Sequence, residues 1–76
     1  MKDLVEFLAK SLVDDPEGVQ VHTLERDQST VYELEVAASD LGKVIGRQGR
    51  TARAMRTLLS AAGQKTRRRY TLDIVD

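Results

Sequence analysis

The chain has 76 residues, of which 41% are hydrophobic and 32% charged, and its formal net charge is zero. This length fits one small domain, near the lower limit at which a hydrophobic core alone stabilises a fold. The absence of cysteine excludes disulfides and most zinc sites and agrees with a reducing cytoplasm. No apolar run is long enough to span a membrane, and the first residues lack the apolar stretch of a signal peptide.

The two halves of the chain carry opposite charges. Residues 1–38 hold three basic and nine acidic residues, a net charge of −6, whereas residues 39–76 hold nine basic and three acidic residues, a net charge of +6. Such a split is typical of a basic face that binds a polyanion. An acidic surface opposite a basic one, serving only solubility, would explain the charges equally well.

The first half of the chain predicts a helix and then a hairpin. Residues 2–14 form the helix, because apolar residues recur there at helical spacing, and the following Pro16 ends it. Residues 19–24 alternate apolar and polar side chains, as a half-buried strand does. A polar turn over residues 26–29 leads to a second, antiparallel strand. Its two faces are Tyr32, Leu34 and Val36 on one side and Glu33 and Glu35 on the other.

From Ser39 the period of the pattern changes from strand to helix. Ser39 or Asp40 caps a short helix with the inner residues Leu41, Val44 and Ile45. A longer helix begins at about Arg50 and buries one side. Gly63 is its predicted C-cap, and residues 64–66 link it to a last strand. The side expected to be buried consists of Ala52, Met55, Leu59 and Ala62.

This order of elements constrains the sheet. Two helices between the second and third strands form a crossover long enough to make those strands parallel neighbours. The expected fold is therefore α+β, in the order α-β-β-α-α-β, with a three-stranded mixed sheet and the helices packed on one face. The other face carries Glu33, Glu35 and Asp73 and is expected to be solvated.

The most informative segment is the Gly-x-x-Gly turn between the two helices. Val44 and Ile45 lead into Gly46-Arg47-Gln48-Gly49, and an arginine-rich helix follows. Glycines let the main chain come close to a ligand, because no Cβ stands in the way. The helix that follows offers unpaired N–H groups and its positive dipole end to an anion. The local chemistry suits a phosphate backbone.

The segment Leu41–Ala52, set in this order of elements, resembles a KH domain of the type II, prokaryotic arrangement. Over essentially its whole length the chain is similar to the small single-KH proteins of bacteria, the KhpA-like family. The resemblance implies one KH domain, with a βααβ core over about residues 30–76 and a helix–strand extension over residues 1–29. It leaves no room for a second domain.

The resemblance also implies single-stranded RNA, held in a groove with its backbone clamped by the glycine loop. Gly46 and Gly49 would bring the main chain against the phosphates, and Arg47 and Gln48 would bond phosphate or sugar. Further contacts fall into an apolar floor (Val44, Ile45 and Ala52) and flanking positive charge (Lys43, Arg50 and Arg53). Because many KH domains carry a larger aliphatic residue in place of Ala52, a shallower groove and weaker base discrimination are expected.

Several of these residues have simpler explanations. At least one of Val44 and Ile45 is expected to serve mainly as core, and Arg53 and Arg56 could merely solvate a helix face. The basic run Arg67–Arg69 leads into a strand whose alternate side chains point in opposite directions. At most Lys65, Arg67 and Arg69 could therefore reach a shared groove. His22 is expected to be a surface residue rather than a metal ligand.

Catalysis is not expected. The chain lacks the phosphate-binding pattern of a nucleotide hydrolase, and one histidine without cysteine leaves little from which to build a nucleophile–base pair. Neither a cofactor nor a small-molecule substrate nor a metal is predicted.

Two hypotheses remain. In the first, the protein holds single-stranded RNA with low sequence specificity, because its few aromatic residues (Phe7, Tyr32 and Tyr70) are expected in the core. In the second, it is a protein-interaction module that forms a homodimer or pairs with a larger multidomain KH protein of the Jag type, and RNA contact is secondary. The resemblance also links the family to post-transcriptional control of cell elongation and division, hence cell shape, and to RNA-chaperone activity.

Overall fold

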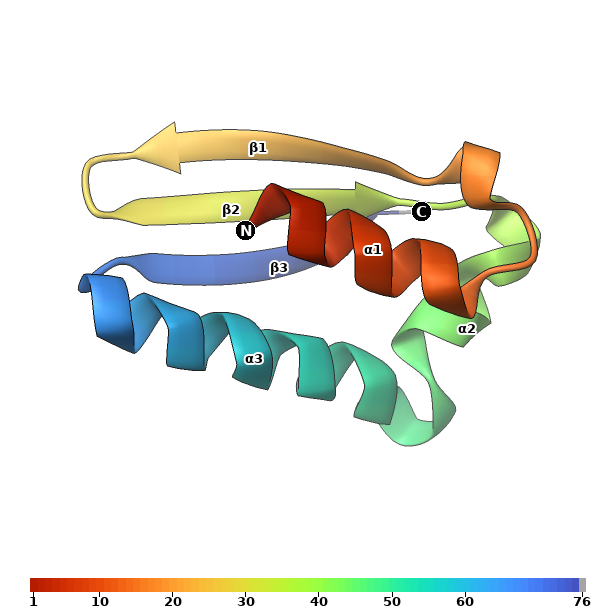
Figure 1. Ribbon diagram of the computed structural model, residues 1–76. Helices are drawn as coiled ribbons and strands as arrows, with labels where there is room; N and C mark the ends of the chain where they lie inside the picture. Colours follow the sequence, from red (N-terminus) through yellow and green to blue (C-terminus); the bar gives the residue numbers. More distant parts are fainter. Residues whose placement is uncertain (76) are drawn as a thin grey trace.

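The computed structural model describes residues 1–75, which form one three-stranded sheet with its helices on a single face (Figure 1). The strands are β1 (Gln20–Arg26), β2 (Ser29–Glu35) and β3 (Arg69–Val75), in the spatial order β1-β2-β3. β1 pairs with β2 antiparallel, and β2 pairs with β3 parallel. The predicted mixed sheet is therefore confirmed. Asp76, the last residue of the predicted βααβ core, lies outside the described residues.

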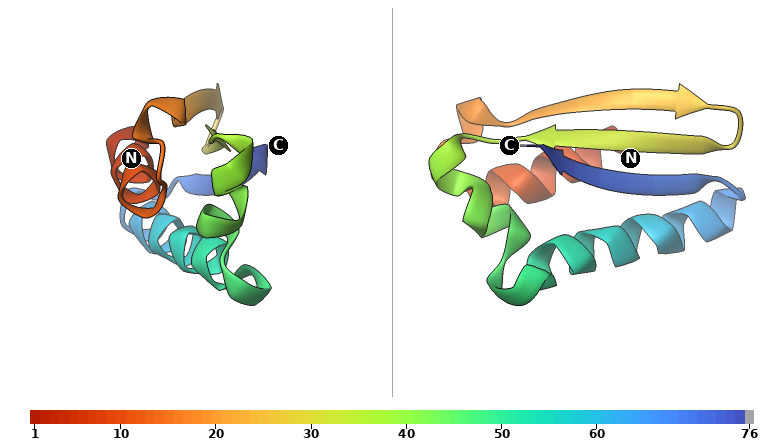
Figure 2. Two further views of the ribbon diagram at one scale, coloured as in Figure 1. Left: turned by 90° about the vertical axis from the view of Figure 1, so that its right-hand side faces the viewer. Right: turned by 180° about the vertical axis from the view of Figure 1, so that it is seen from behind.

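The α-helices are α1 (Lys2–Leu12), α2 (Leu41–Ile45) and α3 (Arg50–Thr66), joined by short 3₁₀ turns. Both α1 and α3 cover the same face of the sheet, and α2 lies beyond the carboxyl ends of β2 and β3 (Figures 1 and 2). The turn between α2 and α3 is therefore at one end of the molecule, and the β1–β2 and α3–β3 turns are at the other. We call these the glycine-loop end and the hairpin end. No helix within residues 1–75 is both long and apolar enough to cross a membrane.

The core forms between the helices and the inner face of the sheet. On β2 and β3, Tyr32, Leu34 and Leu72 are buried. The helices cover them with Val5, Ala9, Val44, Met55 and Leu59. On the outer face, Glu33 is half-buried and stands opposite the exposed Asp73, as period-2 alternation requires. Glu33, Glu35 and Asp73 therefore share the outer face of the sheet, as predicted.

The helix α1 differs from its prediction in length and in orientation. It ends at Leu12 rather than at residue 14, because Val13 already has an extended backbone. Its inner residues are Val5 and Ala9, which are 2% and 0% exposed. Residues two apart on a helix point about 200° apart, so Phe7 faces away from the core and is 66% exposed. The prediction that Phe7 belongs to the core was wrong.

Gly63 was predicted to end the long helix, and this was also wrong. The helix continues through Thr66, so residues 64–66 are helical, and Arg67 takes the left-handed conformation that follows it, with φ 57°. Gly63 is buried inside the helix for a different reason. A Cβ at this position would lie 2.1 Å from the backbone oxygen of Arg68, so the chain can return over the helix only because the side chain is absent.

The hairpin is longer than the alternation indicated. β1 extends to Arg26 and β2 begins at Ser29, so only Asp27 and Gln28 form the turn. At the other end of β2 the strand stops at Glu35, and Val36 packs against the core from the segment that follows.

Candidate nucleic-acid interface

The glycine loop has a backbone that requires glycine at its first position. Gly46 has φ 78° and ψ 170°, a region that is essentially restricted to glycine. A Cβ at Gly46 would lie 2.2 Å from the Oγ1 of Thr51 and 2.8 Å from its backbone nitrogen. The loop therefore folds tightly against the first turn of α3.

Two further residues of the loop are left-handed. Gly49 has φ 74°, and its N–H donates to the carbonyl of Gly46 at 3.1 Å. Gln48 has φ 56°, which is uncommon for a residue with a side chain and costs about 1–2 kcal/mol. The sequence pattern assigned positive φ to neither residue explicitly, and nothing in it singles out Gln48. Arg47 and Gln48, the two residues between the glycines, are both exposed.

Arginine side chains surround this loop, and within residues 1–75 no carboxylate pairs with them. Arg47, Arg50 and Arg53 are exposed, and the first turn of α3 contains no acidic residue. Within residues 1–75 the ion pairs involve only lysines, so no arginine there is paired with a carboxylate. No side chain caps the N-terminus of α3. Its first N–H groups and the helix dipole therefore favour an anion at this end.

The three apolar residues expected in the floor differ in their exposure. Val44 is 0% exposed and belongs to the hydrophobic core, and Ala52 is 3% exposed. Ile45 is 36% exposed beside the loop. The expectation that at least one of Val44 and Ile45 serves mainly as core is therefore met by Val44. Of the three, only Ile45 offers a substantial apolar surface to a ligand.

Lys43 is held by two carboxylates. Its Nζ donates to Asp14 Oδ2 at 2.7 Å and to Asp40 Oδ1 at 3.3 Å. The hydrogen bond to Asp14, and then the one to Asp40, raises the pKa of Lys43 above its ordinary value. Asp14 and Asp40 therefore largely neutralise the charge of Lys43, which was predicted to face the RNA.

Asp40 has a role that the sequence pattern did not reveal. It occupies the N-cap position of α2, but its side chain does not cap that helix. The carboxylate is 1% exposed and accepts hydrogen bonds from the backbone N–H groups of Asp14 and Asp15. Burial alone would raise the pKa of Asp40, but these two bonds and the one from Lys43 lower it below its ordinary value. Asp40 thereby ties the segment after α1 to the helix that leads into the glycine loop.

The remaining basic candidates lie along α3 and beyond it. The Nε–H of Arg56 donates to the carbonyl of Leu72 at 3.2 Å, which joins α3 to the open edge of β3. Lys65 and Arg67 stand at the C-terminal end of α3, and a 17-residue helix is about 25 Å long. The structure therefore does not bring Lys65 and Arg67 together with the glycine loop.

No group of three or more potential metal ligands occurs within residues 1–75. His22 is exposed on β1, opposite Glu33.

The α-β-β-α-α-β order, the mixed sheet and the glycine loop between α2 and α3 define a KH domain of the type II arrangement. The family model for the KH domain of KhpA/KhpB matches residues 2–74. The chain therefore belongs to the KhpA/KhpB family of KH-domain proteins.

Relatives of nearly the same length support this assignment. The chain is 53% identical over 74 residues to the RNA-binding protein KhpA of Borreliella burgdorferi, covering 97% of this chain and 90% of the relative. It is 51% identical to that of Clostridium acetobutylicum, covering 99% of this chain and all of the relative. It is 49% identical to that of Aquifex aeolicus, covering all of this chain and 96% of the relative. No solved structure gave a significant match.

Proposed function

We propose that this chain, as one KH domain, binds single-stranded RNA through the Gly46–Gly49 loop. The observation that carries the proposal is the loop itself, a glycine-dependent turn set against the uncapped N-terminus of α3, among arginines that form no ion pair within residues 1–75. Such a turn and helix end suit phosphate groups. The relatives named RNA-binding protein KhpA support the same ligand class.

In this proposal the main chain at Gly46 and Gly49 approaches the phosphates, and Arg47 and Gln48 bond phosphate or sugar. Arg50 and Arg53 add positive charge, and Ile45 supplies apolar surface for a base. Val44 and Ala52 are buried and contribute by packing α2 and α3 in place beneath the loop. Lys43 contributes mainly by fixing α2 through Asp14 and Asp40 rather than by a free charge.

The proposed binding has low sequence specificity. Tyr32 and Tyr70 pack on each other in the sheet, with ring centroids 6.0 Å apart, and Phe7 lies on α1. Stacking on aromatic rings therefore adds little at the loop, and backbone contacts dominate. Binding of this kind weakens steeply as salt rises.

We place this activity in the bacterial cytoplasm, in post-transcriptional regulation that includes RNA-chaperone activity and genes of cell elongation and division. The resemblance to the KhpA-like family supports this role.

The loop is tested by the double variant Arg47→Asp/Gln48→Asp. Two carboxylates against the phosphates should weaken binding of a fluorescently labelled single-stranded RNA by more than about 100-fold. Aspartate is compatible with left-handed backbone, so the fold should survive, as thermal unfolding would show. The matched control is Lys10→Asp/Ser11→Asp, which makes the same charge change on exposed positions of α1. Equal RNA affinity of the loop variant and the parent would contradict the proposal.

A second candidate function is an interaction module, in which the chain forms a homodimer or pairs with another KH protein. A specific observation favours it, namely apolar side chains left exposed on the helices. Phe7 and Leu4 on α1 are 66% and 37% exposed, and Leu58 on α3 is 50% exposed. Leu4 and Phe7 are neighbours three residues apart on α1, and exposed apolar side chains that lie together are typical of protein contacts.

Sedimentation equilibrium tests this candidate. The parent is expected to sediment as a dimer at high micromolar concentration, and Phe7→Ser should shift it toward monomer. Ser60→Ala, at an exposed position of α3, is the matched control. A parent that stays monomeric, alone and with a multidomain KH partner added, would rule the module out.

A further inference from the structure

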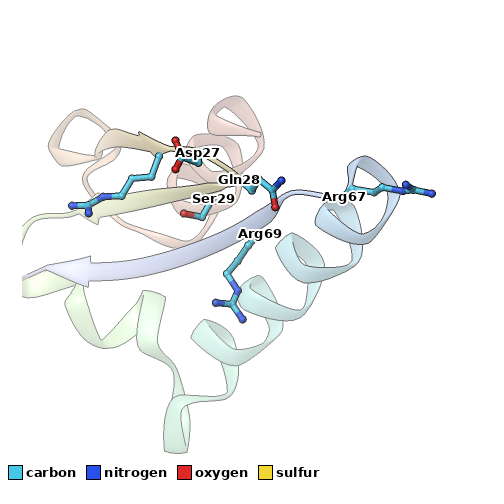
Figure 3. A pocket seen from close by; sticks show the side chains of 6 residues that line it. Asp27, Gln28, Ser29, Arg67 and Arg69 are labelled. Carbon is cyan, nitrogen blue, oxygen red and sulfur yellow. The ribbon is translucent and has the colours of Figure 1, made fainter.

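The hairpin end of the molecule carries a second concentration of arginine that the glycine-loop site does not use. Arg26, Arg67 and Arg69 line an open pocket of about 440 Å³ together with Asp27, Gln28 and Ser29 (Figure 3). Asp27 is the one acidic residue among these six. The pocket joins two turns that are about 40 residues apart in the sequence, so no local pattern could reveal it.

Arg68 fixes these two turns to each other. Its Nε donates to the Oγ1 of Thr30 at 2.7 Å, and its two terminal nitrogens donate to the carbonyls of Asp27, Arg26 and Ser29 at 3.2–3.3 Å. The N–H of Arg69 also donates to the carbonyl of Gln28 at 2.9 Å. These hydrogen bonds hold together the two turns that carry the pocket.

Unlike Arg68, the three arginines that line the pocket do not hold the two turns together through their side chains. The carbonyl of Gly63 near the end of α3 accepts from the N–H of Arg68, and Thr66 bonds that helix end through its hydroxyl. Within residues 1–75 the side chains of Arg26, Arg67 and Arg69 form no ion pair. Several like charges gathered without carboxylate partners repel one another, and an anionic ligand would relieve that repulsion.

The geometry suits an extended polyanion rather than a single ion. The strand register puts Arg26, Ser29 and Arg69 side by side on the outer face of the sheet, so the two arginines stand about 10 Å apart across β2. Arg67 points away from the α3–β3 turn and Arg69 toward another side, so their guanidinium groups do not converge (Figure 3). A row of phosphates could meet them in succession.

We propose that Arg26, Arg67 and Arg69, the hairpin-end site, form a second contact for the phosphate backbone of RNA held at the glycine loop. This inference rests on the proposed RNA binding. About 25 Å of helix separates the two sites, whereas four stacked nucleotides span only about 14 Å. The hairpin-end site therefore adds affinity for longer RNA alone.

The test compares labelled uridine oligonucleotides of four and sixteen residues by fluorescence anisotropy at several salt concentrations. Arg67→Gln/Arg69→Gln should bind the longer RNA about tenfold more weakly, and its salt slope should fall by roughly 1.4, or ~0.7 for each lost phosphate contact. Affinity for the four-residue RNA should stay within twofold of the parent. The matched control is Lys2→Gln/Lys10→Gln, which removes two charges from α1 and should bind both RNAs like the parent.

The outcomes separate this proposal from the loop proposal. Both sites are supported if Arg47→Asp/Gln48→Asp weakens the binding of both RNAs and Arg67→Gln/Arg69→Gln weakens the binding of the longer RNA alone. Equal affinity of parent and Arg67→Gln/Arg69→Gln for the longer RNA overturns the hairpin-end site and leaves the loop site standing. Competition by polyglutamate as strong as by unlabelled RNA would also overturn it, in favour of an acidic protein ligand. A parent that binds neither RNA would remove both proposals.

Discussion

Gly63→Ala is expected to destabilise the fold by about 2–3 kcal/mol, although alanine is normally the better helix former. In an ordinary helix interior the change would stabilise by up to about 1 kcal/mol. Here the new Cβ would lie 2.1 Å from the backbone oxygen of Arg68. Arg68 is anchored to the hairpin by four side-chain hydrogen bonds, so the clash cannot be relieved by moving a flexible side chain. Overpacking of this kind costs about 1–3 kcal/mol or more.

Urea denaturation of Gly63→Ala and Gly42→Ala measures this directly. Gly42 is exposed in α2, and a Cβ there would meet no atom within 4 Å. Gly42→Ala should therefore stabilise the protein by about 0.5–1 kcal/mol, through helix propensity alone. If the two alanine variants were equally stable, the close approach of the Arg68 backbone to Gly63 of α3 would be wrong.

Gly46→Ala is expected to disrupt the glycine loop and to weaken RNA binding by more than about tenfold. The Cβ would meet the side chain and the backbone nitrogen of Thr51, at 2.2 and 2.8 Å. The backbone angles of Gly46, in a region that is essentially glycine-only, add about 1–3 kcal/mol of strain. The loop must then rearrange, and the N-terminus of α3 is no longer presented in the same way.

Gly49→Ala is the matched comparison, because Gly49 also has positive φ but a Cβ there would meet no atom within 4 Å. The free energy of unfolding of Gly49→Ala should fall by only about 1–2 kcal/mol, the cost of placing a residue with a Cβ in left-handed backbone. Thermal unfolding should therefore rank the parent above Gly49→Ala and Gly49→Ala above Gly46→Ala. Equal stability of the two glycine variants would show that the packing against Thr51 is not as described.

The order of elements and the sheet topology could be predicted because they follow from short-range patterns. Alternation fixed which residues of β2 and β3 face inward, and the length of the crossover fixed the parallel pair. The glycine loop could be found because glycine, β-branched residues and arginines adjoin in the sequence. The proposal that this loop binds a phosphate backbone rests on the same few residues.

What could not be predicted depends on contacts between distant segments. Gly63 resembles a C-cap in sequence, and only the return of Arg68 over the helix explains its place inside α3. Asp40 resembles a helix cap, yet its partners are the backbone of Asp14 and Asp15. Phe7 fits an apolar stripe, but the stripe that meets the sheet is centred on Val5 and Ala9, which lie two residues from Phe7 and on the opposite side of the helix. The length of α3 separates Lys65 and Arg67 from the loop, and counting charges along the sequence does not reveal that distance.

The central claim, that RNA is held at the glycine loop, is tested most directly by backbone amide chemical shifts of the ¹⁵N-labelled protein during titration with a short single-stranded RNA. The largest shift changes are expected within residues 43–53, around Gly46–Gly49 and the first turn of α3. Amides of β1 and of the middle of α1 should move little. If the largest changes fell on the outer face of the sheet or on α1, with the loop amides unmoved, RNA would be bound elsewhere and the account would be contradicted.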